Sequence, residues 1–174
     1  MKEQIPINKA HRLINAGCVV LITSAFEKKE NIMSLAWQTP LSSKPMLIGI
    51  AVAQAHLTHE FIINSREFVI NIPGWNLLEK VIFCGKNKGR NINKIKDSGL
   101  RFTPSSKVNV PIVEDCLANI ECRVTENVTT GDHSFFVAEV LNAVAEKNMF
   151  DGVWGKEVEL IHHLGGTDYY PGKP

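Results

Sequence analysis

Small hydrogen-bonding side chains surround a tryptophan in the segment NIMSLAWQTPLSSKP, residues 31–45. The segment lies between two apolar runs, so its polar groups are expected close to the core. A small-molecule site needs such a combination of hydrogen-bonding groups and an aromatic wall. The side chains that provide it are Asn31, Ser34, Trp37, Gln38 and Thr39. The simpler interpretation is a strand and a loop in which Trp37 is buried and the polar residues form turns.

Thr58 indicates a second kind of chemistry, because it stands where a helix is expected to begin, between His56 and His59. Free backbone N–H groups at a helix N-terminus favour a phosphate, both through hydrogen bonds and through the helix dipole. The commoner role of a threonine there is to cap its own helix. The two roles are compatible.

A second candidate phosphate site is the basic stretch KNKGRNINKIK, residues 86–96, where Asp97 is the nearest opposing charge. Its cationic side chains are Lys86, Lys88, Arg90, Lys94 and Lys96. Most basic runs are solvated surface, so the run alone indicates an anion site only weakly.

His133 lies beside an expected hairpin turn, GDH, where a histidine is more often an exposed bystander than a catalyst. The sequence contains no GxSxG nucleophile elbow and no glycine-rich Rossmann fingerprint. His162 and His163 are neighbours on an expected strand and would point to opposite faces, so no metal site is predicted. The four cysteines form no CxxC pair, and we expect reduced, mostly buried thiols.

Length and composition predict a single globular domain over residues 1–174, because 44% hydrophobic residues suffice for one sizeable core. The formal net charge of +1 makes no case for nucleic acid or for an anionic membrane surface. The start of the chain lacks the order of residues found in a signal peptide, and no apolar run reaches about 18 residues. We therefore expect a soluble, cytoplasmic protein.

Hydrophobic periodicity predicts alternating strands and helices. A short helix is expected over Asn8–Ala16, and strands buried on both faces are expected over Cys18–Phe26 and Met46–Ala53. The charged segment EKKEN, residues 27–31, is expected to form a turn between these two strands. Further along, we expect a helix over 57–67, a strand over 68–73, a helix over 76–85 and a turn at residues 98–99.

The last third of the sequence is predicted to be mostly strand. From Leu117 apolar and polar residues alternate, with Glu121 on the polar side, as in a half-buried strand. A turn over 129–134, a return strand over 135–146 and a final strand over 158–166 with a polar tail follow. Strands with inserted helices predict an α+β domain built on an antiparallel barrel, because closure removes exposed edges.

Four blocks, in this order, resemble the flavin reductase-like proteins of the FMN-binding split-barrel fold, most closely the flavoredoxin branch. The blocks are residues 31–73, KGRNINK (88–94), GDHSFFVAEV (131–140) and HHLGGTDYY (162–170). The resemblance spans roughly residues 15–170. It implies an antiparallel split β-barrel with inserted helices, and a homodimer with one FMN per subunit held non-covalently at the subunit interface.

The resemblance also implies which residues surround the cofactor. A flavin ring has a polar edge and a flat face, which suits the side chains named in the segment 31–45. The implied cofactor-binding residues are Asn31, Ser34, Trp37, Gln38, Thr39, Ala53, His56, Leu57, Thr58, Arg90 and Lys94. The family usually has Ser-Gly-Arg, acidic residues and then Lys at the basic stretch. This chain has Lys88, Gly89 and Arg90, with Asn91 and Asn93 in the acidic places, so its loop is more basic.

His133 matches a family histidine that lies beside the cofactor. The resemblance implies that His133 is the catalytic residue and acts electrostatically, by orienting a nicotinamide or stabilising negative charge on reduced flavin. The tail has two open interpretations. Tyr169 or Tyr170 packs on a flavin ring, of its own or the partner subunit, or the tail is ordinary surface.

The implied function is that of an FMN-dependent oxidoreductase. It is either an NAD(P)H:flavin reductase, with NADH or NADPH bound transiently against the flavin, or a flavoredoxin-like electron carrier with a redox partner protein. An alternative is a non-catalytic split-barrel protein that senses flavin or binds another planar ligand such as haem.

Overall fold

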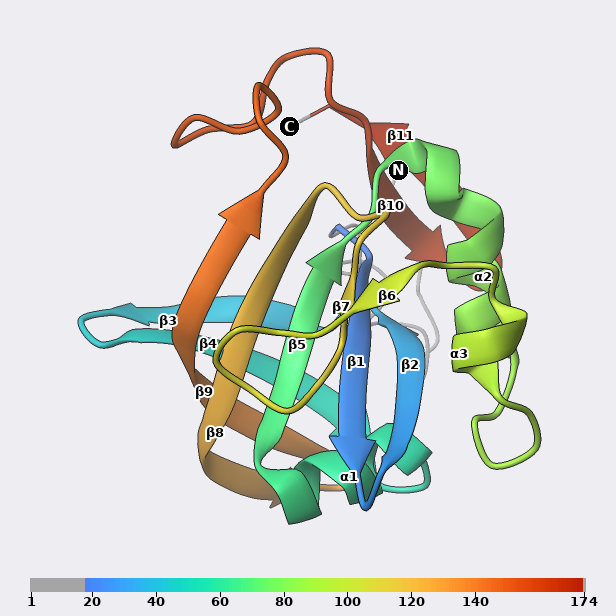
Figure 1. Ribbon diagram of the computed structural model, residues 1–174, viewed down its shortest axis with the longest axis vertical. Helices are drawn as coiled ribbons and strands as arrows, with labels where there is room; N and C mark the ends of the chain where they lie inside the picture. The colour runs from blue at the N-terminus through green and yellow to red at the C-terminus, as the bar shows by residue number, and fades with distance from the viewer. Residues whose placement is uncertain (1–17, 174) are drawn as a thin grey trace, which may run out of the picture.

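Seven strands of the chain form one antiparallel sheet, which curves around a common interior (Figure 1). The computed structural model describes residues 18–173, so the helix expected over Asn8–Ala16 lies outside the described residues. The order of strands in the sheet is β2-β1-β5-β8-β9-β4-β3. Their bounds are β1 Val20–Phe26, β2 Lys29–Leu35, β3 Gln38–Ser43, β4 Met46–Ala53, β5 Glu67–Ile72, β8 Ala118–Thr130 and β9 His133–Ala145. The predicted antiparallel barrel is confirmed.

Helices close one end of the barrel and cover one side of it. Helix α1, Leu57–Ser65, joins β4 to β5 at the lower end in Figure 1. A 3-10 helix, Trp75–Leu77, leads into α2, Leu78–Lys86, and α2 and α3, Lys94–Asp97, pack against β2. Two small sheets complete the fold: β6, Phe102–Thr103, with β7, Ile112–Val113; and β10, Leu160–Gly165, with β11, Asp168–Gly172.

β1 is mostly buried and faces an apolar cluster on each side, as its largely apolar, β-branched run predicted. Val20 and Ile22 point into the barrel core, whereas Leu21 belongs to a second cluster that includes Val81 and Cys84 of α2. Residues that alternate along a strand face opposite sides of the sheet. A strand that separates two cores therefore carries apolar residues on both of its faces.

The first half of β4 differs from its prediction, because Met46 is 47% exposed. Its neighbour β3 is the last strand at this end of the sheet and is itself mostly exposed. β3 contains Pro40, and its register with β4 shifts between Pro40 and Ser42. The backbone N–H of Ala51 donates to the Trp37 carbonyl at 2.9 Å. Along an antiparallel pair, residues alternately direct their backbone N–H and C=O toward the partner strand and away from it. Pro40 is three residues after Trp37, so its backbone nitrogen points away from β4.

Two segments that were predicted to be loops contain parts of a strand or a helix. The turn expected over residues 27–31 consists of Glu27 and Lys28, whose φ angles of 48° and 63° form the two-residue connection of a tight hairpin. β2 starts directly afterwards, at Lys29. The basic stretch also does not remain a loop, because the Asn93 side chain accepts a hydrogen bond from the Lys96 N–H and caps α3.

Glu121 of β8 was predicted on the solvated face and is buried, with 3% of its surface exposed. Residues 104–111 cross over this part of the sheet. The Glu121 carboxylate accepts hydrogen bonds from the N–H groups of Ser106 (3.2 Å) and Lys107 (2.6 Å), the Ser106 hydroxyl (2.9 Å) and the Asn142 amide (2.9 Å). The alternating pattern of a strand cannot show that a distant segment covers its polar face.

The C-terminal segment forms a hairpin. The final strand and tail expected from residue 158 onward pair with each other as β10 and β11, with His163 opposite Tyr169. The two rings lie 5.2 Å apart. The tail is therefore part of the folded structure next to α2 and β2, and Tyr170, opposite His162, is 56% exposed.

Candidate functional site

A cavity of about 440 Å³ lies between β2, the start of α1 and the loop that follows α2. Residues far apart in the sequence line it together, and many of them are among those expected around the cofactor. The predicted site residues on its wall are Asn31, Ser34, His56, Leu57, Thr58, Arg90 and Lys94. The cavity is within the size range of small-molecule sites.

Thr58 is fully buried, and its hydroxyl accepts a hydrogen bond of 2.8 Å from the Asn31 amide. It is the second residue of α1, and His56 occupies the cap position, so Thr58 does not cap its own helix. The first turn of a helix has backbone N–H groups without intrahelical partners. Leu57 and Thr58 line the cavity, and the positive end of the helix dipole therefore faces it.

Two glycines, one in the last turn of α2 and one in the loop after it, allow close approach to β2. A Cβ atom on Gly89 would lie less than 3.0 Å from Oδ1 of Asn31, and one on Gly85 would lie 3.2 Å from Oγ of Ser34. The Ser34 hydroxyl donates to the carbonyl of Val81 in α2. Both glycines line the cavity and were absent from the predicted site. The available signal was the position of Gly89 between two cations.

Lys94 is a buried cation, with 5% of its surface exposed. Its Nζ donates to the carbonyl of Cys84 at 2.9 Å, and it forms no ion pair with a residue of the described part of the chain. Desolvation lowers the pKa of Lys94 from 10.5 to about 8. Burial raises the pKa of the adjacent Cys84 thiol to about 11, so this thiol does not supply a counter-charge at neutral pH. An ammonium group in this position favours an anion in the cavity.

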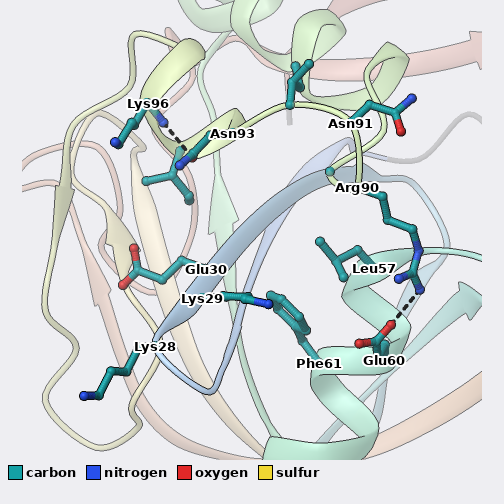
Figure 2. Close-up of a pocket in the computed structure, with 13 residues that line it drawn as sticks. Lys28, Lys29, Glu30, Leu57, Glu60, Phe61, Arg90, Asn91, Asn93 and Lys96 are labelled. Carbon is teal, nitrogen blue, oxygen red and sulfur yellow. Dashed lines mark hydrogen bonds and ion pairs between the residues drawn. The ribbon is translucent and has the colours of Figure 1, made fainter.

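Further basic groups surround the same cavity. Lys86, Lys88 and Arg90 line it. Arg90 also pairs with Glu60 of α1 at 2.6 Å, as Figure 2 shows, and both of these side chains are about half exposed. His56 is kept neutral at pH 7, because desolvation and the charge of Lys94 lower the pKa of its imidazole. The cavity is thus positively charged without a charged histidine.

Trp37, Ala53 and His133 form a second group next to this cavity. The Trp37 and His133 rings lie 4.9 Å apart at 30°, and Ala53 pairs with His133 across β4 and β9. His133 Nδ1 also lies 2.7 Å from a carboxylate oxygen of Asp132. The His56 N–H donates to the Ala53 carbonyl at 3.0 Å, so His56 contacts the residue that pairs with His133. The aromatic group therefore adjoins the cavity at His56.

Gln38 and Thr39 lie elsewhere. They line a separate cavity of about 290 Å³ with apolar side chains of the barrel. The Gln38 amide donates to the Cys18 carbonyl, which ties β3 to the start of β1. The structure thus separates these two residues from Thr58 and Lys94. Tyr169 is nearer, since it lines a small cavity that also contacts Ser34, Gly85 and Lys86.

Within residues 18–173, no three His, Cys, Asp or Glu side chains are grouped as metal ligands would be. None of the helices in this range is both long enough and apolar enough to cross a bilayer.

A family model and a relative each match most of the chain. Residues 12–166 match the family described as flavin reductase like domain. An uncharacterized protein of Pyrococcus abyssi is 37% identical over 164 residues, which cover 92% of this chain and 93% of the relative.

Solved structures show the same fold. The FMN-binding protein from Thermus thermophilus, solved with bound 1-cyclohex-2-enone, superposes with a TM-score of 0.87 at 24% identity, covering 100% of this chain and 94% of that chain. The flavoredoxin from Methanosarcina acetivorans superposes with a TM-score of 0.84 at 24% identity, covering 100% and 92%. These likenesses confirm the split-barrel architecture.

Proposed function

The chain belongs to the flavin reductase-like family, and on this premise we propose that it is an oxidoreductase that binds FMN non-covalently in the cavity beside Thr58 and Lys94. One observation supports the proposal more than any other: the ammonium group of Lys94 is buried in that cavity and forms no ion pair within the described residues. A phosphate would supply the missing negative charge.

The residues on the page fit the phosphate end of FMN. Lys94 would provide a buried positive charge, Thr58 a hydroxyl, and the start of α1 its backbone N–H groups. Gly89 keeps the loop close to β2, so that Arg90 reaches the same cavity. Asn31 holds the Thr58 hydroxyl in place through its 2.8 Å hydrogen bond.

The flavin ring would occupy the side of the cavity toward His56. There Trp37 and His133 offer an aromatic wall and an imidazole near the ring. When bound, FMN supplies the electron-accepting ring, and the protein positions it and shields it from solvent. His133 is proposed to orient a donor or stabilise negative charge, as its hydrogen bond with Asp132 fixes the ring position.

A homodimer with the flavin at the subunit interface is part of the proposal. Trp37 is 40% exposed, and the nearby edge of the sheet carries exposed Leu41 and Met46. Exposed apolar side chains gathered in one region favour contact with another protein surface. A second copy of the chain would cover Trp37 and thereby complete the wall of the site.

Two activities are compatible with this site. The matching family is described as flavin reductase like, and the solved structures include a flavoredoxin, so the chain is proposed to act either as an NAD(P)H:flavin reductase or as an electron carrier with a redox partner. Steady-state oxidation of NADH or NADPH with added FMN separates them, because a carrier should show little turnover. In a reductase, His133→Ala should bind FMN normally and be reduced more slowly.

The test of the proposal is the visible absorption spectrum of the purified protein, followed by heat release and identification of the released compound. A yellow protein that releases FMN at about one equivalent per chain supports the proposal. A colourless protein that also fails to bind added FMN overturns it, and a Soret band would indicate haem instead.

A further inference from the structure

Lys94 is placed to act as a nucleophile inside the proposed FMN cavity. Its side chain lines that cavity while only 5% of its surface is exposed. Among the described residues, its Nζ donates one hydrogen bond, of 2.9 Å, to the Cys84 carbonyl. An amine that has lost its extra proton can keep such a hydrogen bond and direct its lone pair elsewhere. The lone pair of Lys94 would then be available to a molecule in the cavity.

The neutral form of Lys94 is well populated at physiological pH. Desolvation lowers the pKa of its amine from 10.5 to about 8. At pH 7.5 about a quarter of the Lys94 side chains are therefore neutral, compared with about one in a thousand for an amine that keeps a pKa of 10.5. Only the neutral amine attacks an electrophile, and buried lysines become nucleophiles in this way.

The groups that face Lys94 do not retain its proton. No Asp or Glu of the described residues lines the cavity. From α2, the Cys84 thiol is neutral, because burial raises its pKa to about 11. From the start of α1, His56 is neutral at pH 7, because desolvation and the charge of Lys94 lower its pKa. The other polar side chains of the cavity wall are cationic or neutral, and they are Asn31, Ser34, Thr58, Lys86, Asn87, Lys88 and Arg90.

The same cavity can hold a small phosphate compound next to Nζ. The start of α1 presents backbone N–H groups and the positive end of the helix dipole to the cavity. The Thr58 hydroxyl accepts its 2.8 Å hydrogen bond from Asn31, so its own proton is available to a phosphate oxygen. A phosphate bound by these groups would lie beside Lys94, which lines the same cavity.

An acyl phosphate bound in this way would be in a reactive position. Its acyl carbon is bonded to an oxygen of the phosphate, so an amine that contacts the phosphate is also within reach of that carbon. Binding that fixes this orientation makes the attack much faster than between free molecules. FMN carries its phosphate on an alcohol carbon, which is not an acyl electrophile, and therefore binds without this reaction.

We propose that Lys94 is a site of acylation by small acyl phosphates, and that acylation prevents FMN from binding. The neutral amine attacks the carbonyl carbon and forms a C–N bond. The bond from that carbon to the phosphate oxygen breaks, inorganic phosphate leaves with the electron pair, and the nitrogen releases a proton to solvent. The product is an uncharged amide, which cannot pair with the FMN phosphate. This step rests on the proposed function, because FMN and the acyl donor compete for one cavity.

The test incubates the flavin-free, full-length protein with acetyl phosphate at pH 7.5 and follows acetylation of each lysine by mass spectrometry. Lys96 is the internal control. It belongs to the same basic run, but it is exposed and lines a neighbouring cavity of about 670 Å³ between β2, α1 and α3 (Figure 2). Lys94 is expected to react about tenfold faster than Lys96. Excess FMN or inorganic phosphate should remove this difference and leave the Lys96 rate unchanged.

Two further measurements exclude general reactivity as the cause. Acetic anhydride has no phosphate, so its preference for Lys94 over Lys96 should be much smaller than that of acetyl phosphate. After treatment with acetyl phosphate, the wild-type protein should bind FMN about 30-fold more weakly than before. The matched variant Lys96→Arg should lose FMN affinity to the same extent, because the residue that it lacks is not the one that matters.

The outcomes separate the acylation site from the proposed function. If the untreated protein binds FMN but Lys94 reacts no faster than Lys96, the acylation site is overturned and the FMN site stands. A fast reaction at Lys94 that neither FMN nor inorganic phosphate slows also overturns it, because the donor is then not held in the cavity. If the untreated protein binds no FMN, the proposed function fails, and the effect of inorganic phosphate on the two rates still decides whether Lys94 is the acylation site.

Discussion

Glu121 and Lys94 are both buried ions, yet their surroundings differ. The Glu121 carboxylate accepts four hydrogen bonds from Ser106, Lys107 and Asn142. Desolvation acts to raise the pKa of Glu121, but these hydrogen bonds outweigh it and hold the pKa below its usual range. Lys94 donates one hydrogen bond, to the Cys84 carbonyl, and desolvation dominates.

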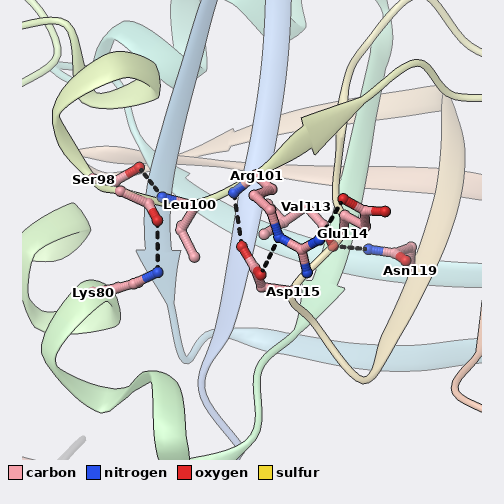
Figure 3. A network of polar contacts seen from close by, with 9 residues as sticks. Lys80, Ser98, Leu100, Arg101, Val113, Glu114, Asp115 and Asn119 are labelled. Carbon is pink, nitrogen blue, oxygen red and sulfur yellow. Dashed lines mark hydrogen bonds and ion pairs between the residues drawn. The ribbon is translucent and has the colours of Figure 1, made fainter.

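The segments around these two ions show the same contrast. The connection that crosses over Glu121 is tied down along its length, and the Asn109 N–H also donates to Glu67 at 2.8 Å. At its ends, Arg101 donates from its backbone and its side chain to Asp115, and the Asn119 amide donates to the Val113 carbonyl (Figure 3). A buried ion whose partners all come from the chain supports the fold. One with few partners is available to a ligand.

The largest effect is expected for Glu121→Ala. Three residues would lose their acceptor in a buried place, and we expect the free energy of unfolding to fall by about 3 kcal/mol. Chemical denaturation measures this loss, and FMN affinity should not change. Weakened FMN binding in a variant that is still folded would break the contrast between the two ions.

Lys94→Met should show the opposite pattern. FMN affinity is expected to fall about 30-fold, as for one charge-assisted phosphate contact. The ligand-free protein should be at least as stable as the wild type, because a desolvated charge is removed. Fluorescence titration with FMN and denaturation together measure both quantities. Loss of stability with unchanged FMN affinity would show that Lys94 is structural.

The pH dependence should distinguish the two ions further. Ligand-free folded protein releases the Lys94 proton at about pH 8, whereas the unfolded chain retains it to about 10.5. The unfolded state therefore binds more protons in this window, so the Lys94 contribution makes the free energy of unfolding rise from pH 8 to pH 10.5. FMN affinity should fall above pH 8, by up to about tenfold per pH unit, because binding must restore the proton. Lys94→Met should remove both dependences.

The smallest effect is expected for Gly89→Ala. The added Cβ would collide with the Asn31 side chain and shift the loop that carries Arg90. We expect FMN affinity to fall about fivefold, equivalent to about 1 kcal/mol. Gly155→Ala is the matched control, because its Cβ would meet its nearest neighbour at an ordinary 3.6 Å. Equal affinity in both variants would show that the close approach at Gly89 does not matter for binding.

Local periodicity was enough to predict much of the barrel. The largely apolar, β-branched run of β1 predicted burial on both faces, and the change to a helical period at Leu57 predicted α1. These signals lie within short windows, where side-chain direction follows directly from the repeat. The family resemblance added the residues that the cavity brings together, including Lys94.

The structure differs from the sequence-based predictions where segments that are distant in the chain meet. Glu121 looked solvated because the residues that cover it lie 14 to 15 positions away in an irregular segment. The sequence does not distinguish the buried Lys94 from the exposed Lys96, because both belong to the same basic run. Gln38 and Thr39 belong to the same polar segment as Asn31 but follow the chain onto β3, at the other end of the sheet.

Pro40 has a consequence for how the protein behaves at high concentration. β3 ends the sheet, and such an edge is a template on which strands of other molecules can pair and aggregate. Proline has no N–H to donate, and the nitrogen of Pro40 faces outward, so an incoming strand would find a missing donor at the middle of the edge. The register shift next to Pro40 bends the strand as well. Pro40 and the register shift thus disfavour the pairing of further strands with β3 and the aggregation that would follow.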